Sequence, residues 1–96
     1  MALEWEDFKD PDEVLDYKLN WAARLEPGDT IVTSIWLLPT VTGAPLVQES
    51  AEFTTTSSTI WLAGGELNAT YDITNRVTTM GGRTMDQTVR LKCKVK

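Results

Sequence analysis

Two runs of alternating apolar and polar residues, one on each side of a Gly-Gly pair, constrain the fold of this chain most strongly. The first run carries Tyr71, Ile73 and Val77, and the second carries Val89, Leu91, Cys93 and Val95. Gly81-Gly82 lies between them. Period-two alternation around such a turn is typical of an antiparallel hairpin with one buried face. The segment from Leu67 to Lys96 therefore predicts a long hairpin that closes an all-β domain.

The preceding residues predict further short strands separated by turns. Residues 14–23 alternate, and residues 30–38 are apolar on both faces and suit a central strand. Residues 46–55 give weaker strands, and residues 59–63 give a short strand that carries Trp61. Glu26-Pro27-Gly28-Asp29 and Gly64-Gly65 supply turn residues between them. The spacing predicts an antiparallel, immunoglobulin-like β-sandwich of about seven strands over residues 14–96. Trp21, Trp36 and Trp61 are expected to anchor its core or an interface.

Residues 1–13 form a predicted extended arm in front of this domain. They lack strong periodicity, and Asp10-Pro11 favours a turn. Two large aromatic residues, Trp5 and Phe8, stand in this otherwise charged segment. We expect them to dock, either on the same domain or on a partner copy.

The charges of the chain are separated along its length, although the net charge is −5. Acidic residues, Asp10 and Asp12 among them, dominate the arm, whereas Arg90, Lys92 and Lys94 mark a basic final strand. This split can steer one copy onto another, head to tail. The alternatives are two solvated faces, or pairing within one chain. An acidic chain disfavours nucleic acid as a partner.

The residue types needed for catalysis or metal binding are scarce. The chain has no histidine, and its single cysteine, Cys93, falls on the inward register of the last strand. The carboxylates of the arm lack the spacing of a calcium loop, and neither Gly-Gly pair sits between a strand and a helix. No apolar run is long enough to span a membrane, and the acidic N-terminus does not resemble a secretory signal. We therefore expect synthesis in a cytoplasm, no enzymatic activity, no cofactor, no metal, no membrane contact and no small-molecule substrate.

Two resemblances extend this interpretation. Tyr71 to Val77 with the Gly81-Gly82 turn resembles the last hairpin of fibronectin type III and related immunoglobulin-like domains. Nearly the whole chain, about residues 9–95, is similar to a group of small phage and prophage proteins. The motifs that carry this similarity are Lys9-Asp10-Pro11-Asp12, Asp16-Tyr17 with Trp21, Gly28-Asp29-Thr30-Ile31, Trp61-Leu62-Ala63-Gly64-Gly65 and the hairpin from Tyr71 to Thr84. The resemblance implies a component of a tailed-phage virion, made in the bacterial host cytoplasm.

Our first interpretation is a decoration or cement protein that covers the capsid in many copies. Its partners would be the major capsid protein or other virion proteins, with self-association in a symmetric array. The expected partner-binding residues are Trp5, Phe8, Asp10, Asp12, Arg90, Lys92 and Lys94. The alternatives are a neck or tail component, such as a connector or tube-surface domain, and a host-surface carbohydrate-binding module that uses Trp36 or Trp61.

Overall fold

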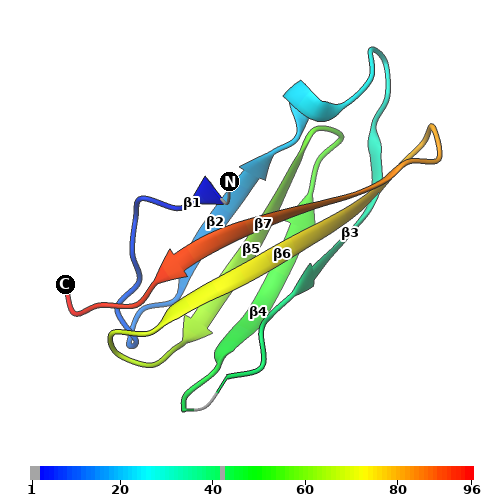
Figure 1. Cartoon of the computed structure of the whole chain (residues 1–96). Coiled ribbons are helices and arrows are strands. Elements are labelled where there is room, and N and C mark those ends of the chain that lie inside the picture. Colours follow the sequence, from blue (N-terminus) through cyan, green and yellow to red (C-terminus); the bar gives the residue numbers. More distant parts are fainter. Residues whose placement is uncertain (1–2, 42) are drawn as a thin grey trace.

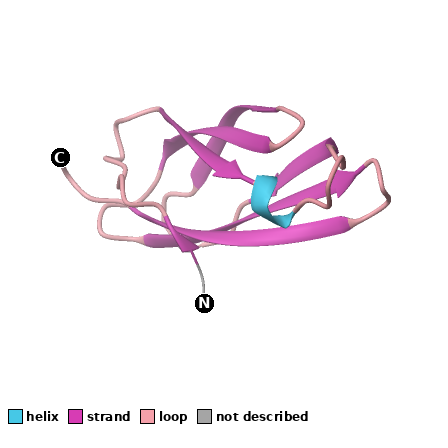
Figure 2. Ribbon diagram, turned by 90° about the horizontal axis from the view of Figure 1, so that it is seen from above, coloured by secondary structure: helices cyan, strands magenta, loops and turns pink. Residues whose placement is uncertain are grey.

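The computed structural model of the chain describes residues 3–41 and 43–96. It consists of two β-sheets packed face to face (Figures 1 and 2). Four strands in the order β1-β7-β6-β3 form one sheet, and three in the order β2-β5-β4 form the other. The strands are β1 (Leu3–Glu4), β2 (Leu15–Asn20), β3 (Ile31–Leu37), β4 (Leu46–Phe53), β5 (Ser57–Gly64), β6 (Thr70–Thr79) and β7 (Thr84–Lys92). The predicted all-β sandwich of about seven strands is confirmed. Residues 1 and 2 of the predicted arm lie outside the described residues.

The β6–β7 hairpin forms where the alternation predicts it. Tyr71 pairs with Leu91 and Ile73 with Val89, and all four side chains are buried. The turn uses Gly82 at φ +89°, a conformation that glycine adopts without strain. The predicted alternation continues too far, because Val95 is 65% exposed. β7 ends at Lys92, so the residues after Cys93 no longer follow the alternation of a strand.

Two strand predictions needed correction. The alternating segment 14–23 ends as a strand at Asn20, whose side chain accepts a hydrogen bond from the Ala22 amide at 2.9 Å. A short 3₁₀ turn, η1 (Ala22–Arg24), follows (Figure 2). The segment 30–38, predicted as a central strand, forms the edge strand β3. Its outward side chains Ile35 and Leu37 are 51% and 40% exposed, so their apolar character does not reflect burial within this chain.

The core lies between the two sheets and includes two of the four tryptophans. Trp21 and Trp36 are buried, whereas Trp61 is 37% exposed on the outer side of the three-stranded sheet. Cys93 is fully buried, as the inward register predicts, and burial raises the pKa of its thiol. The other buried apolar residues are Tyr17, Leu19, Ile31, Leu46, Ile60, Leu62, Tyr71, Ile73, Val77, Met85, Val89 and Leu91.

A buried polar network joins the two layers. The side-chain oxygen of Asn75 on β6 accepts the indole N–H of Trp21 at 2.9 Å, and its amide nitrogen donates to Ser34 Oγ and to the Ile35 carbonyl, each at 2.9 Å. The hydroxyls of Ser34 and Ser58 lie 2.6 Å apart, so the network reaches from β3 to β5. The Trp21–Asn75 and Ser34–Ser58 bonds cross between the layers and fix the position of one sheet relative to the other, whereas the bonds from Asn75 to Ser34 and Ile35 join neighbouring strands of one sheet.

The connection between β5 and β6 is closed by the Tyr71 hydroxyl. This oxygen accepts the Glu66 amide at 2.8 Å and donates to the Ala44 carbonyl at 2.6 Å. Two separate loops are thereby held at one end of the sandwich, which defines the positions of β4 and β6 relative to each other.

Candidate partner-binding surface

The arm lies along the outer edge of β7 of its own domain. β1 runs parallel to β7, with Leu3 opposite Val89. Further along, the Trp5 amide donates to the Arg90 carbonyl at 3.0 Å and the Lys9 amide to the Lys92 carbonyl at 3.0 Å. Of the two docking modes left open by the sequence, the described residues therefore adopt the one within a single chain. The domain boundary at residue 13 stays a prediction.

Trp5 bridges the two sheets. Its ring centroid lies 4.8 Å from that of Tyr17 on β2 and 6.1 Å from that of Trp36 on β3. The indole N–H donates to the Lys18 carbonyl at 3.2 Å. Trp5 thus fills the opening between β7 and β2, and the burial of this region raises the pKa of Tyr17 well above its ordinary value.

Lys9 is the residue whose role the sequence analysis missed. Its side chain is fully buried. The ammonium group donates to the carbonyl oxygens of Gly64 at 2.6 Å and Asp10 at 2.9 Å, with Pro11 at the 3.5 Å limit. Burial lowers its pKa despite the surrounding negative charge. The only sequence signal was that Lys9 is the sole cation of the arm.

The arm ends in a tight turn built by Asp10. The Glu13 amide donates to the Asp10 carbonyl at 2.9 Å, and the Asp12 amide donates to the Asp10 carboxylate at 3.0 Å. This second bond is the main reason that the pKa of Asp10 is lowered. The Lys96 amide also donates to the same carboxylate at 3.2 Å. Asp10 is therefore engaged in holding the turn, whereas the Asp12 side chain is exposed at its tip.

The basic residues of the final strand lie on one face, but most are paired within the chain. Arg90 contacts Asp72 at 3.1 Å, and Lys92 contacts Glu4 of the arm at 3.1 Å. Lys94 lies 5.8 Å from the centroid of the Phe8 ring. The charge split noted in the sequence is thus satisfied in part by the arm and β7 of one chain. Exposed pairs of this kind contribute at most about 1 kcal/mol each, so they exchange partners at low cost.

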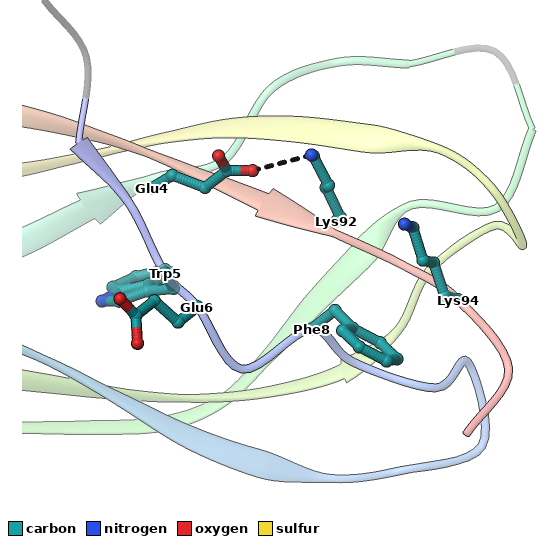
Figure 3. A pocket seen from close by; sticks show the side chains of 6 residues that line it. All are labelled: Glu4, Trp5, Glu6, Phe8, Lys92 and Lys94. Atoms are coloured by element: carbon teal, nitrogen blue, oxygen red, sulfur yellow. Dashed lines mark ion pairs between the residues drawn. The ribbon is translucent and has the colours of Figure 1, made fainter.

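Phe8 and the lysines border a groove between the arm and the end of β7 (Figure 3). The groove has a volume of about 440 Å³ and is lined by Glu4, Trp5, Glu6, Phe8, Lys92 and Lys94. In the view of Figure 3, the ammonium groups of Lys92 and Lys94 lie above the Phe8 ring. An aromatic ring beside cations and carboxylates suits a polar peptide segment with an apolar anchor. Of the seven expected residues, the groove gathers Trp5, Phe8, Lys92 and Lys94, while Asp10, Asp12 and Arg90 lie outside its lining.

Other kinds of site find little support in residues 3–41 and 43–96. No group of His, Cys, Asp and Glu side chains in these ranges is arranged to hold a metal ion. No helix in the same ranges is long and apolar enough to cross a bilayer. Of the two tryptophans considered for glycan binding, Trp36 is buried, and only Trp61 presents part of its ring to solvent.

The fold and the groove define a small all-β module whose surfaces suit contact with other proteins. The sequence matches the family described as "Podophage GP4 fiber-tail adaptor protein gp77" over residues 9–92, and the chain belongs to this family. No curated protein matches the chain. The chain is therefore a small phage protein and a component of the virion. The family agrees better with the tail component that we gave as an alternative than with capsid decoration, which it does not support.

Proposed function

We propose that this protein is a non-enzymatic structural adaptor that joins a fibre to the tail of a phage particle. The family match over residues 9–92 carries this proposal. The major capsid protein and a capsid-wide array are not part of it. The partners are instead other proteins of the tail and fibre, and the mechanism is shape and charge complementarity with no chemical step.

We infer that the domain is immunoglobulin-like in its connections. One sheet holds β3, β6 and β7 and the other β2, β5 and β4. This is the arrangement of strands C, F, G and B, E, D in constant-type immunoglobulin domains. The Tyr71 hydroxyl bond to the backbone five residues upstream supports the same assignment. Such domains present loops and edges at the surface while the sandwich stays rigid.

The groove beside the arm is the surface that we propose for one of the two partners. Phe8 supplies an apolar anchor, and Lys92 and Lys94 supply cations that an acidic segment can contact. Arg90 lies on β7 before these lysines, and Asp10 lies beyond them, where its carboxylate accepts the Lys96 amide at 3.2 Å. Trp5 acts indirectly, because its ring packs on Tyr17 and Trp36 and holds the groove in shape.

The test of the adaptor function is a phage that lacks this gene. We expect particles with intact heads and tails but no attached fibres, and purified protein added back should restore the fibres. Electron microscopy of the particles should then show the protein in a ring-like set of copies at the tail. Fibres retained without the protein would refute the proposal, as would hundreds of copies on the head.

The groove is tested separately by Phe8→Ala and Lys94→Glu. Both side chains are at the surface of the groove, so the fold should be retained. We expect at least a tenfold loss in fibre or tail binding, measured by titration calorimetry. The matched control is Lys18→Glu, an equal charge change at an exposed lysine of β2. Equal loss in the control would show that only the net charge of the chain matters.

A further inference from the structure

The arm has more residues than β7 between the two points where these segments pair. Glu4 pairs with Arg90 and Lys9 with Cys93, so five steps along the arm run beside three steps along β7. The surplus residues have to leave the edge, and residues 6–8 bulge away from β7 between the two pairs (Figure 3). Two of the residues that line the groove stand on this bulge, so its position decides the shape of the groove.

Within the described ranges, no backbone hydrogen bond ties the bulge to β7. The amides of Trp5 and Lys9, on either side of it, donate to β7 carbonyls, whereas the amides of residues 6–8 donate to no protein acceptor in these ranges. A segment with unpaired amides keeps one conformation only when its side chains are held. The contacts of its side chains therefore determine whether Phe8 stays in one place.

Lys96 contacts both the bulge and the turn that ends the arm. Its ammonium nitrogen lies 3.3 Å from the Asp7 carboxylate and 3.0 Å from the Glu13 carboxylate. The same nitrogen lies 5.8 Å from the centroid of the Phe8 ring. The Lys96 amide donates to Asp10 Oδ2 at 3.2 Å. One residue thus connects the side chains of the bulge to a turn that is fixed by its own hydrogen bonds.

The contacts of Lys96 form a network and not an isolated surface pair. The side chains of Lys96 and Glu13 are each 33% exposed, less than both partners of the other ion pairs in the described ranges. The bond from Glu13 is the main reason that the pKa of Lys96 is raised, and Asp7 adds to it. An ammonium group shared by two carboxylates and an aromatic face is held more firmly than it would be by one exposed carboxylate.

We propose that Lys96 is a positioning residue for the groove, because it holds the bulge of residues 6–8 against the turn and thereby fixes the Phe8 anchor. Lys96 does not line the groove, so its effect on a partner is indirect. A preformed anchor favours binding, since the partner does not have to order it. The effect on binding rests on the proposed function, whereas the ordering of the bulge is a property of the free chain.

The ordering of the bulge is tested in the free protein by nitrogen-15 relaxation. In Lys96→Met, which keeps an apolar side chain but loses the charge, we expect the order parameters of residues 6–8 to fall from about 0.85 to below about 0.6, with β6 and β7 unchanged. Lys96→Arg keeps the charge and the donors and should keep the bulge ordered. Lys94→Met is the matched control, because Lys94 also lies 5.8 Å from the Phe8 centroid but takes no part in the ion pairs to Asp7 and Glu13.

Fibre or tail binding is then measured by titration calorimetry. Lys96→Met should weaken binding roughly fivefold, and Lys96→Arg should restore it. Lys18→Met, the same change at an exposed lysine of β2, controls for the lost charge. A bulge that stays ordered in Lys96→Met would overturn the proposal, as would one that loosens equally in Lys94→Met. A bulge that loosens without any change in binding would support the role of Lys96 in ordering it and refute the groove as the binding surface.

Discussion

The buried ammonium group of Lys9 provides a sharp test of how the arm is held. Lys9→Met keeps the length and most of the volume of the side chain but removes its charge and its donors. The Gly64 carbonyl, which accepts from Lys9 Nζ at 2.6 Å, would lose this donor, whereas the Asp10 carbonyl would keep its bond from the Glu13 amide at 2.9 Å. We expect the substitution to weaken the attachment of the arm to the end of β5.

The magnitude follows from two opposing effects. A buried acceptor that loses its donor costs about 1–3 kcal/mol, and the Gly64 carbonyl is the one affected here. Part of this cost is offset, because the folded protein no longer has to desolvate an ammonium ion. The expected net loss is about 1–2 kcal/mol in the free energy of unfolding. For a domain of this size, that corresponds to a fall of roughly 5–15 °C in Tm.

The assay is urea and thermal unfolding monitored by tryptophan fluorescence, with amide hydrogen exchange at Trp5 and Lys94 to report on the arm. Lys18→Met is the control, because it makes the same substitution at an exposed lysine of β2 and should change Tm by less than about 3 °C. Loss of protection confined to the arm would locate the effect at the attachment.

The pH dependence gives an independent readout. The pKa of Lys9 in the folded protein lies below its ordinary value of 10.5, so the folded chain releases this proton before the unfolded chain does. The folded chain therefore carries the full desolvation penalty of the charged group below the lowered pKa, and this penalty is relieved as pH rises from the lowered pKa to 10.5. The stability of the wild type relative to Lys9→Met should rise with pH in this window. A Tm unchanged by Lys9→Met, or a difference that shrinks with pH, would refute the reasoning.

Three further outcomes are expected. Asn75→Ala removes the acceptor of the buried Trp21 indole N–H and a donor to the Ile35 carbonyl, and it should cost about 2–4 kcal/mol in urea unfolding. A cost equal to that of an exposed substitution would contradict the inter-layer role. Gly65→Ala should prevent stable folding, because the backbone has φ +105° and a Cβ would lie 2.6 Å from Cys93 Sγ. Adding Cys93→Ala should restore only part of the stability, since the backbone strain at residue 65 remains. Full rescue would disprove the strain. Hydrogen bonds from the Thr79 side chain and the Gly81 amide lower the pKa of Asp29, so its contribution to stability is present above its ordinary pKa of 3.8 and is lost as pH falls. Asp29→Asn should therefore flatten the fall of the urea midpoint between about pH 4 and 2. An unchanged fall would exclude this carboxylate as a source of the acid sensitivity.

The sequence predicted the elements whose signals are local. The β6–β7 hairpin follows from an alternation and a turn that lie within one continuous segment. The turn at Pro27-Gly28 is likewise local, with a bond of 2.9 Å from the Asp29 amide to the Glu26 carbonyl and Gly28 at φ +80°. In both cases the residues that make the structure are close together in the chain, so their pattern suffices.

The features that sequence reasoning missed depend on contacts between distant segments. The apolar pattern of β3 predicts a strand in the centre of a sheet. The pattern alone does not show whether a second strand pairs with the other edge of β3. The burial of Lys9 depends on a carbonyl 55 positions away, at Gly64, whereas lysine is almost never fully buried. The groove has the same origin, because it exists only once the arm has paired with β7.

The parallel pairing of β1 with β7 has a mechanical consequence. Tension applied between the arm and the C-terminal end of β7 pulls these two strands in opposite directions along their length. The bonds from Trp5 and Lys9 to β7, and from Lys94 back to Lys9, are then sheared together, since none opens before the strands slide. A hairpin pulled from its two ends would unzip one bond at a time. Rupture under such a pull is governed by the unfolding rate and not by equilibrium stability. A virion protein that is pulled in this direction therefore resists mechanical unfolding through the orientation of a few hydrogen bonds.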